Sequence, residues 1–146
     1  MFYLDTSALL KLYVLERGSE AIQHLVESSD LPLPVWEIQE MELINALRLK
    51  LFRGELEVDD VDHQIDCFDD RKRRGLYFCP EIDRRALRRS FRDFSRHTTD
   101  TGCRTMDILH VACAFQIRDV AFVSFDDRQC NLAERVGLEV VSRPGS

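Results

Sequence analysis

Two acidic residues follow apolar runs that have the length and composition of buried strands. Asp5 comes directly after residues 2–4, and Asp126 follows residues 120–124 with one residue between them. The carboxyl ends of parallel strands meet at one edge of a sheet, where such sheets place their binding sites. We therefore expect Asp5 and Asp126 to converge, although a helix cap or a turn would explain each of them alone.

Two further acids stand in helical patterns rich in apolar residues. Glu42 falls in a stripe with helical spacing, which predicts that its carboxylate faces apolar surface. Asp107 stands near the start of a hydrophobic helix that Thr105 could cap. A salt bridge or an edge position would also explain Glu42, and the helix dipole would explain Asp107. The stripe around Glu42 consists of Ile38, Met41, Asn45, Leu49 and Phe52.

Taken together, the four acids predict a metal site. Two unit charges about 4 Å apart repel by roughly 4 kcal/mol at an effective dielectric constant of about 20, so a cluster would need a divalent cation to hold it together. Oxygen ligands favour Mg²⁺ or Mn²⁺ over Zn²⁺. Such an ion can activate a water for attack on phosphorus. The sequence contains no glycine-rich phosphate loop that would compete for this role.

Short apolar strands alternate with helices along the chain. This order predicts a single α/β domain over residues 1–146, with a central, mainly parallel sheet flanked by helices. The expected strands are residues 2–4, 31–35, 76–78, 120–124 and 138–141. The expected helices are residues 8–15, 19–27 with Ser19 as a cap, 37–53, 58–74, 81–96, 105–118 and 127–136. The polar residues 97–102 are expected to form a loop.

Composition and charge narrow the class of protein. The formal net charge of -6 argues against a protein that coats duplex DNA through bulk charge. No apolar run approaches the roughly 18 residues of a membrane span, and the first residues lack a secretory signal. The five cysteines include no C-x-x-C pair, which favours buried, reduced thiols in a cytoplasmic protein.

Four segments, in order, resemble the PIN-domain ribonucleases, and specifically the VapC-type toxins of toxin–antitoxin modules. They are Leu4–Lys11, Glu42–Leu47, Arg104–Ala112 and Phe122–Gln129. The resemblance spans nearly the whole chain. It implies a PIN fold, cleavage of RNA that depends on Mg²⁺ or Mn²⁺, and inhibition by a partner antitoxin.

The resemblance also assigns roles to residues. It places Asp5, Glu42, Asp107 and Asp126 at the catalytic and metal-binding positions of the family. Hydroxyl groups of Thr6, Ser7 and Ser124 would lie near the metal, and Asn45 would supply an amide behind it. Asp127 is a second acid beside Asp126, and whether it joins the site is left open.

Two surfaces are candidates for partners. Arg85, Arg89, Arg92 and Arg96 recur at helical spacing and could contact RNA phosphates or an acidic antitoxin segment, or could simply be solvated. Ile44, Leu47 and Leu51 lie away from the Glu42 stripe and could form a homodimer surface or pack within the monomer. His110, one turn after Asp107, is expected to be a hydrogen-bonded core histidine.

Two rival functions remain. A catalytically silent PIN-like domain would act as a binding module. A phosphotransfer or phosphatase domain also places an acid after its first strand. The phosphatase kind requires a second Asp where Ser7 stands, and the receiver kind requires a lysine that is absent after Asp126.

Overall fold

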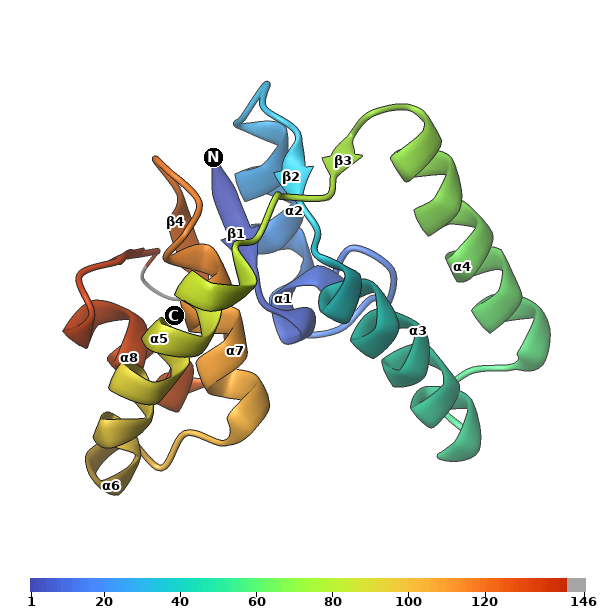
Figure 1. Ribbon diagram of the computed structural model, residues 1–146. Coiled ribbons are helices and arrows are strands. Elements are labelled where there is room, and N and C mark those ends of the chain that lie inside the picture. The colour runs from blue at the N-terminus through green and yellow to red at the C-terminus, as the bar shows by residue number, and fades with distance from the viewer. Residues whose placement is uncertain (142–146) are drawn as a thin grey trace.

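The computed structural model describes residues 1–141 and arranges them as parallel strands surrounded by helices (Figure 1). One sheet has the order β1-β4-β5, and a second sheet pairs β2 with β3. Every pairing between these strands is parallel, which confirms the expected α/β class with a mainly parallel sheet flanked by helices. The strands are β1 (Phe2–Leu4), β2 (Leu33–Pro34), β3 (Tyr77–Phe78), β4 (Ala121–Val123) and β5 (Glu139–Val140).

The helices agree with the expected segments in order and approximate position. They are α1 (Thr6–Leu10), α2 (Ser19–Glu27), α3 (Glu37–Phe52), α4 (Val58–Arg73), α5 (Arg84–Phe94), α6 (Thr98–Thr101), α7 (Thr105–Ala114) and α8 (Asp127–Arg135), with a 3₁₀ turn, η1 (Ser95–His97). In Figure 1, α3 and α4 form an antiparallel pair on one side of the sheet. Helices α5, α7 and α8 lie on the other side.

The prediction of a loop at residues 97–102 is wrong, because helical structure continues there. Segment η1 extends α5, and α6 follows it directly. The Thr101 hydroxyl donates to the carbonyl of His97, and the segment ends where Gly102 adopts a positive φ of 69°. Polar side chains that satisfy backbone groups locally made this short helix resemble a loop.

Three other boundaries differ from expectation. Helix α1 ends at Leu10 and α7 at Ala114, each about one turn early. Ser19 is the first residue of α2 and not its cap, because Gly18 occupies the cap position in the left-handed region. The Ser19 hydroxyl instead donates to the carbonyl of Val14 and accepts from the amide of Glu16, which holds the preceding turn.

The core lies on both faces of the sheet. Tyr3 and Phe122 point to one face and Leu4 and Val123 to the other, as the two-residue period of a strand requires. Helices cover both faces, which explains why the strand sequences are apolar throughout. Fully buried residues on the first face include Phe122, Val111 and Leu132, and those on the second include Leu9, Ile22, Leu43, Leu47, Val61 and Phe68.

Helix α3 is rotated relative to the expected orientation. Leu43 and Leu47 are buried against the core, whereas Met41 and Phe52 of the predicted stripe are 65% and 87% exposed. Most of the predicted stripe is therefore exposed to solvent, whereas Glu42 itself is partly buried against His110. Leu47 belongs to the monomer core and Leu51 packs against it, so packing within the monomer is the alternative that the fold supports for these two residues.

The five cysteines form no disulfide within residues 1–141. Cys103 and Cys113 are buried, and Cys79 is exposed. The expectation of buried thiols thus holds for two of the five. No helix within residues 1–141 is long and apolar enough to cross a bilayer.

Gly18 provides a test of how the fold supports the end of β4. A Cβ atom at Gly18 would lie 2.8 Å from the ring of Phe125, which separates Ser124 from Asp126, and the φ of Gly18 is +90°. Gly54 has a similar φ of +74° but open space around it. We expect Gly18→Ala to reduce the free energy of unfolding by about 1–3 kcal/mol more than Gly54→Ala does, because only the first substitution overpacks the site. Denaturant titration of both variants measures this, and equal losses would contradict it.

Candidate active site

Asp5 is the most deeply buried of the four acids, with 1% of its surface exposed. It follows β1 and caps α1, where its Oδ1 accepts from the amide of Ala8 at 2.8 Å. The hydroxyl of Ser7 donates to both carboxylate oxygens at 2.8 and 2.9 Å, and the hydroxyl of Ser124 donates to Oδ2 at 2.8 Å. The carboxylate of Asp5 is therefore fixed by three neutral donors.

Burial raises the pKa of Asp5, even though the charge of His110 and the donors at Ala8, Ser7 and Ser124 act in the opposite direction. Within residues 1–141, Asp5 has no ion-pair partner among the salt bridges. A buried carboxylate without an adjacent cation is unfavourable in the charged form. Asp5 would consequently be stabilised by a cation from solution.

Ser124 joins Asp5 to Asp126 at the end of β4. Its hydroxyl donates to Asp5 and accepts from the backbone amide of Asp126 at 3.0 Å. Ser124 thus joins the carboxylate of Asp5 to the backbone of Asp126, which places the two residues at the same end of the sheet. Asp126 caps α8 and is bound by the fork of Arg128, whose Nη2 lies 2.6 Å from Oδ2 and whose Nε lies 3.1 Å from Oδ1. The hydrogen bonds from Arg128 lower the pKa of Asp126.

Asp107 is buried in the first turn of α7. Its Oδ2 accepts from the amide of Arg104 at 2.7 Å, so Arg104 and not Thr105 holds the cap position. Its Oδ1 accepts from Nε2 of Gln129 at 3.1 Å, which ties α7 to α8. The other amide atom of Gln129, Oε1, is buried without a hydrogen-bond partner. This acceptor beside Asp107 would accept a hydrogen bond from a water.

Glu42 and His110 form a short contact between α3 and α7. Nε2 of His110 lies 2.6 Å from Oε2 of Glu42, and the hydroxyl of Thr6 donates to the same oxygen at 2.7 Å. The hydroxyl of Tyr3 lies 3.0 Å from Nδ1 of His110. Partial burial pushes the pKa of Glu42 upward, but the bonds from His110 and Thr6 outweigh it and leave the pKa lowered. A carboxylate oxygen only accepts, so Nε2 of His110 carries the proton.

The remaining predicted site residues divide into two groups. The hydroxyls of Thr6, Ser7 and Ser124 contact acids directly, as the resemblance implied. Asn45 is exposed and, in the described part of the chain, makes no hydrogen bond to an acid. Asp127 is exposed and lines an open hollow of about 450 Å³ beside Asp126, together with Ser7, Phe125 and Arg128.

Three residues near the acids were missed or underrated in the sequence. Arg128 and Gln129 lie two and three residues after Asp126, in the first turn of a predicted helix, and bind Asp126 and Asp107. Their position in that turn was the available signal. His110 is a buried, hydrogen-bonded histidine as expected, but its partner Glu42 lies 68 residues away in sequence.

The four acids can be compared with the set of ligands that a divalent cation requires. Among residues 1–141, no three His, Cys, Asp or Glu side chains form a group that could hold a metal ion. Each carboxylate instead faces protein donors. Two observations nevertheless suit a hydrated, oxygen-preferring cation: the buried Asp5 lacks a cationic partner, and Oε1 of Gln129 lacks a donor. The oxygen donors of these side chains are of the type that Mg²⁺ or Mn²⁺ prefers, but their positions do not form a complete set of ligands for such an ion.

Three of the four acids have a basic neighbour in the protein. Asp126 has Arg128 at 2.6 Å, Glu42 has His110 at 2.6 Å, and Nε of Arg104 lies 3.8 Å from Asp107. These neighbours reduce the repulsion among the acids, and the prediction that a cation also joins them stays a prediction.

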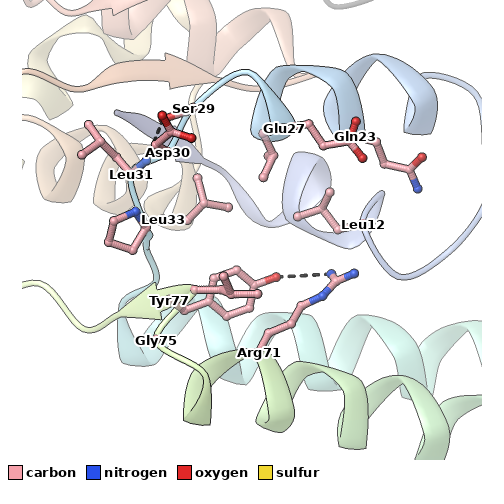
Figure 2. Close-up of a pocket in the computed structure, with 13 residues that line it drawn as sticks. Leu12, Gln23, Glu27, Ser29, Asp30, Leu31, Leu33, Arg71, Gly75 and Tyr77 are labelled. Carbon is pink, nitrogen blue, oxygen red and sulfur yellow. Dashed lines mark hydrogen bonds between the residues drawn. The ribbon is translucent and has the colours of Figure 1, made fainter.

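A separate cavity of about 550 Å³ contains none of the four acids. Figure 2 shows it between the turn at Leu12, helix α2 and the segments before β2 and β3, with Arg71 and Tyr77 on one wall. Nη1 of Arg71 lies 3.4 Å from the hydroxyl of Tyr77, and the guanidinium covers the ring of Tyr13. Arg71, the cationic residue in the lining of this cavity, thus contacts Tyr77 and Tyr13, and the cavity is separate from the acidic site.

Comparisons with known proteins show the fold. No family model and no curated protein matches the chain. Among solved structures, the chain is similar to FitAcB from Neisseria gonorrhoeae, with 15% sequence identity, coverage of 98% of each chain and a TM-score of 0.68. This likeness shows that the chain has a PIN-like fold.

The raised pKa of Asp5 predicts how a variant's stability depends on pH. When the folded-state pKa of a carboxyl lies above its unfolded value, ionisation destabilises the fold as pH rises through the raised pKa. Asn at this position keeps a good helix cap and does not ionise. We expect metal-free Asp5→Asn to melt about 2–4 °C above the wild type at neutral pH, where roughly 1 kcal/mol has this effect in a chain of this size.

The difference in melting temperature should vanish in acid, where the wild-type carboxyl is neutral too. Thermal melts in chelator at several pH values measure it. Asp66→Asn, which removes an exposed acid on α4, is the control and should show no such trend. A variant less stable than the wild type at neutral pH would contradict the electrostatic analysis of Asp5.

Proposed function

We propose that this chain is an endoribonuclease that depends on Mg²⁺ or Mn²⁺ and hydrolyses RNA phosphodiester bonds. The observation that carries the proposal is the juxtaposition of Asp5 and Asp126, bridged by Ser124 at the carboxyl end of a PIN-like parallel sheet. Glu42 accepts a hydrogen bond from Thr6, the neighbour of Asp5, and Asp107 accepts one from Gln129, three residues after Asp126. Four acids at one end of such a sheet suit phosphodiester chemistry.

We also propose that the ribonuclease is the toxin of a toxin–antitoxin pair. The structural neighbour FitAcB is a toxin–antitoxin complex, and its FitB toxin is a PIN-domain protein. The extent of the likeness, 98% of both chains, supports the same role for this chain. The antitoxin partner, a homodimer and a cytoplasmic location remain predictions.

Asp5 is the first residue that would hold the cation, with Asp126, Asp107 and Glu42 around it. The cation would supply activation of an attacking water and stabilisation of the charge that develops on the phosphate oxygens. Ser7, Ser124 and the amide of Ala8 fix the orientation of the Asp5 carboxylate. Arg104 and Arg128 place positive charge beside the acids, where the negative phosphate must approach.

A silent binding module is the second candidate, and one observation favours it. Every one of the four carboxylates accepts hydrogen bonds within the protein, and no ligand cluster is present among residues 1–141. A module of this kind would bind RNA or a partner without binding a cation. Direct measurement of cation binding therefore separates the two functions.

We expect Mg²⁺ or Mn²⁺ to support RNA cleavage, a chelator to abolish it, and Asp5→Asn to reduce it by at least 10²-fold. The cation should also raise the melting temperature of the wild type, because only the folded chain brings the acids together. Gel assays on a labelled RNA and thermal melts with and without Mn²⁺ measure the two effects.

Asp66→Asn serves as the matched control and should keep both the cleavage and the stabilisation by Mn²⁺. Cleavage that persists in excess chelator would contradict the mechanism. Absence of both cleavage and cation binding would favour the silent module.

The ends of the products test which group attacks phosphorus. If an activated water attacks, the bond to the 3′ oxygen breaks and the products carry a 5′-phosphate and a 3′-hydroxyl. If the 2′-hydroxyl of the RNA attacks, a 2′,3′-cyclic phosphate forms instead. We expect the first pair of ends, which mass spectrometry of a short cleaved RNA distinguishes from the second.

A further inference from the structure

Helix α5 presents an exposed face of arginines. Its core side is formed by Leu87, Phe91 and Phe94, which pack in the cluster that α7 shares. The opposite side has no apolar side chain among the large exposed hydrophobic residues of the described chain. The arginine face consists of Arg84, Arg85, Arg88, Arg89, Arg92 and Arg96, all of them exposed.

Little of this positive charge is neutralised within residues 1–141. Arg96 contacts Asp93 at 3.9 Å, and Arg89 is close enough to Asp83 to lower the pKa of that carboxyl, after the larger effect of the amides of Ala86 and Arg85. No ion pair joins the other four arginines to an acid of the described chain. The charge is concentrated on one helix of a protein whose net charge is -6. Solvation alone does not explain why so many arginines lie on one helix of an acidic protein.

The arginine face leads to the acidic site. Helix α5 continues through η1 into α6, and Gly102, which ends α6, lies against the side chain of Arg128. Arg128 binds Asp126, and the exposed Arg104 contacts Asp107. Positive side chains therefore stand both on the surface of α5 and at the rim of the acids, and α6, which has no basic residue, connects the two places along the chain. In Figure 1, α6 lies at the end of α5, and the chain then turns back toward α7.

We propose that the arginine face of α5 binds the phosphate backbone of a single RNA strand and guides it into the acidic site. This inference rests on the proposed ribonuclease function and specifies where its substrate lies. A polyanion without apolar anchors suits a face that offers only guanidinium groups. An acidic protein segment would bury aromatic or aliphatic anchors, and the face has no exposed apolar residue to receive them.

The length of the face sets the length of RNA it recognises. At 1.5 Å per residue, the interval from Arg85 to Arg96 measures about 16 Å along the helix. Several successive phosphates of one strand can lie over that distance. RNA that extends beyond the cleaved bond should therefore bind more tightly than a dinucleotide, which reaches only the acids.

The test is reversal of charge at two central positions. Arg89→Glu with Arg92→Glu removes two phosphate contacts, whereas Arg73→Glu with Arg74→Glu makes the same change in charge at the end of α4. Binding of a fluorescent 20-nucleotide oligouridylate is measured in chelator, so that no cleavage occurs, over a series of salt concentrations. Thermal melts confirm that both variants fold, and the milder pair Arg89→Gln with Arg92→Gln is measured in parallel.

We expect the α5 reversal to weaken binding at low salt at least tenfold and the α4 reversal to leave it within about twofold. The slope of log affinity against log salt should fall by about 1.4, since each lost contact to a single strand contributes about 0.7. The Gln pair should show an intermediate loss. Equal affinity for wild type and α5 variant, or equal losses in both reversals, would overturn the proposal.

A 20-residue polyglutamate peptide tests the protein alternative. If it competes with the oligouridylate as strongly as RNA of equal length does, the face recognises acidic protein and the RNA assignment is overturned. Because binding is measured without cleavage, the two proposals fail separately. RNA binding through α5 with no cleavage in Mn²⁺ would leave this surface standing and remove the ribonuclease, whereas cleavage without dependence on α5 would do the reverse.

Discussion

The rest of the site depends on the burial of one carboxylate, that of Asp5. Its backbone amide donates to the carbonyl of Val123, its side chain caps α1, and Ser124 donates to it from the end of β4. These bonds join the first strand of the chain to a strand that follows almost 120 residues later. The acid that the proposed chemistry requires is thus also a residue that joins β1 to β4. Burial that raises its pKa is the cost of this double role.

Local chemistry was sufficient to predict most of the fold and much of the acidic site. Apolar runs followed by Asp5 and Asp126 predicted strands, helix caps and the convergence of two acids, because strand direction and capping are properties of neighbouring residues. Helical patterns singled out Glu42 and Asp107, and the resemblance in four ordered segments then placed them at the acidic positions of the family. Hydroxyls adjacent in sequence to an acid, such as Ser7, were likewise predictable, since their reach is one turn of chain.

Long-range packing was not predictable from the same patterns. Helix α3 carries apolar residues on more than one side, so periodicity alone could not decide whether Met41 or Leu43 faces the core. Its rotation is set by packing against α1 and α4. The partnership of Glu42 with His110 follows from that rotation and joins residues far apart in sequence. A salt bridge was one of the explanations considered for Glu42, but the identity of its partner, His110, could not be read from the sequence.

The four acids differ in what must change before they can bind a cation. Asp126 must give up part of the fork of Arg128, and Glu42 part of its contact with His110, which are charge-assisted bonds. Asp107 holds the first turn of α7 through one oxygen and Gln129 through the other. Asp5 has only neutral donors to share, and its ionised form is the one that burial disfavours. A cation would therefore be bound most favourably at Asp5. To bind the other acids as well, it would have to displace their hydrogen bonds to basic or neutral neighbours in the protein.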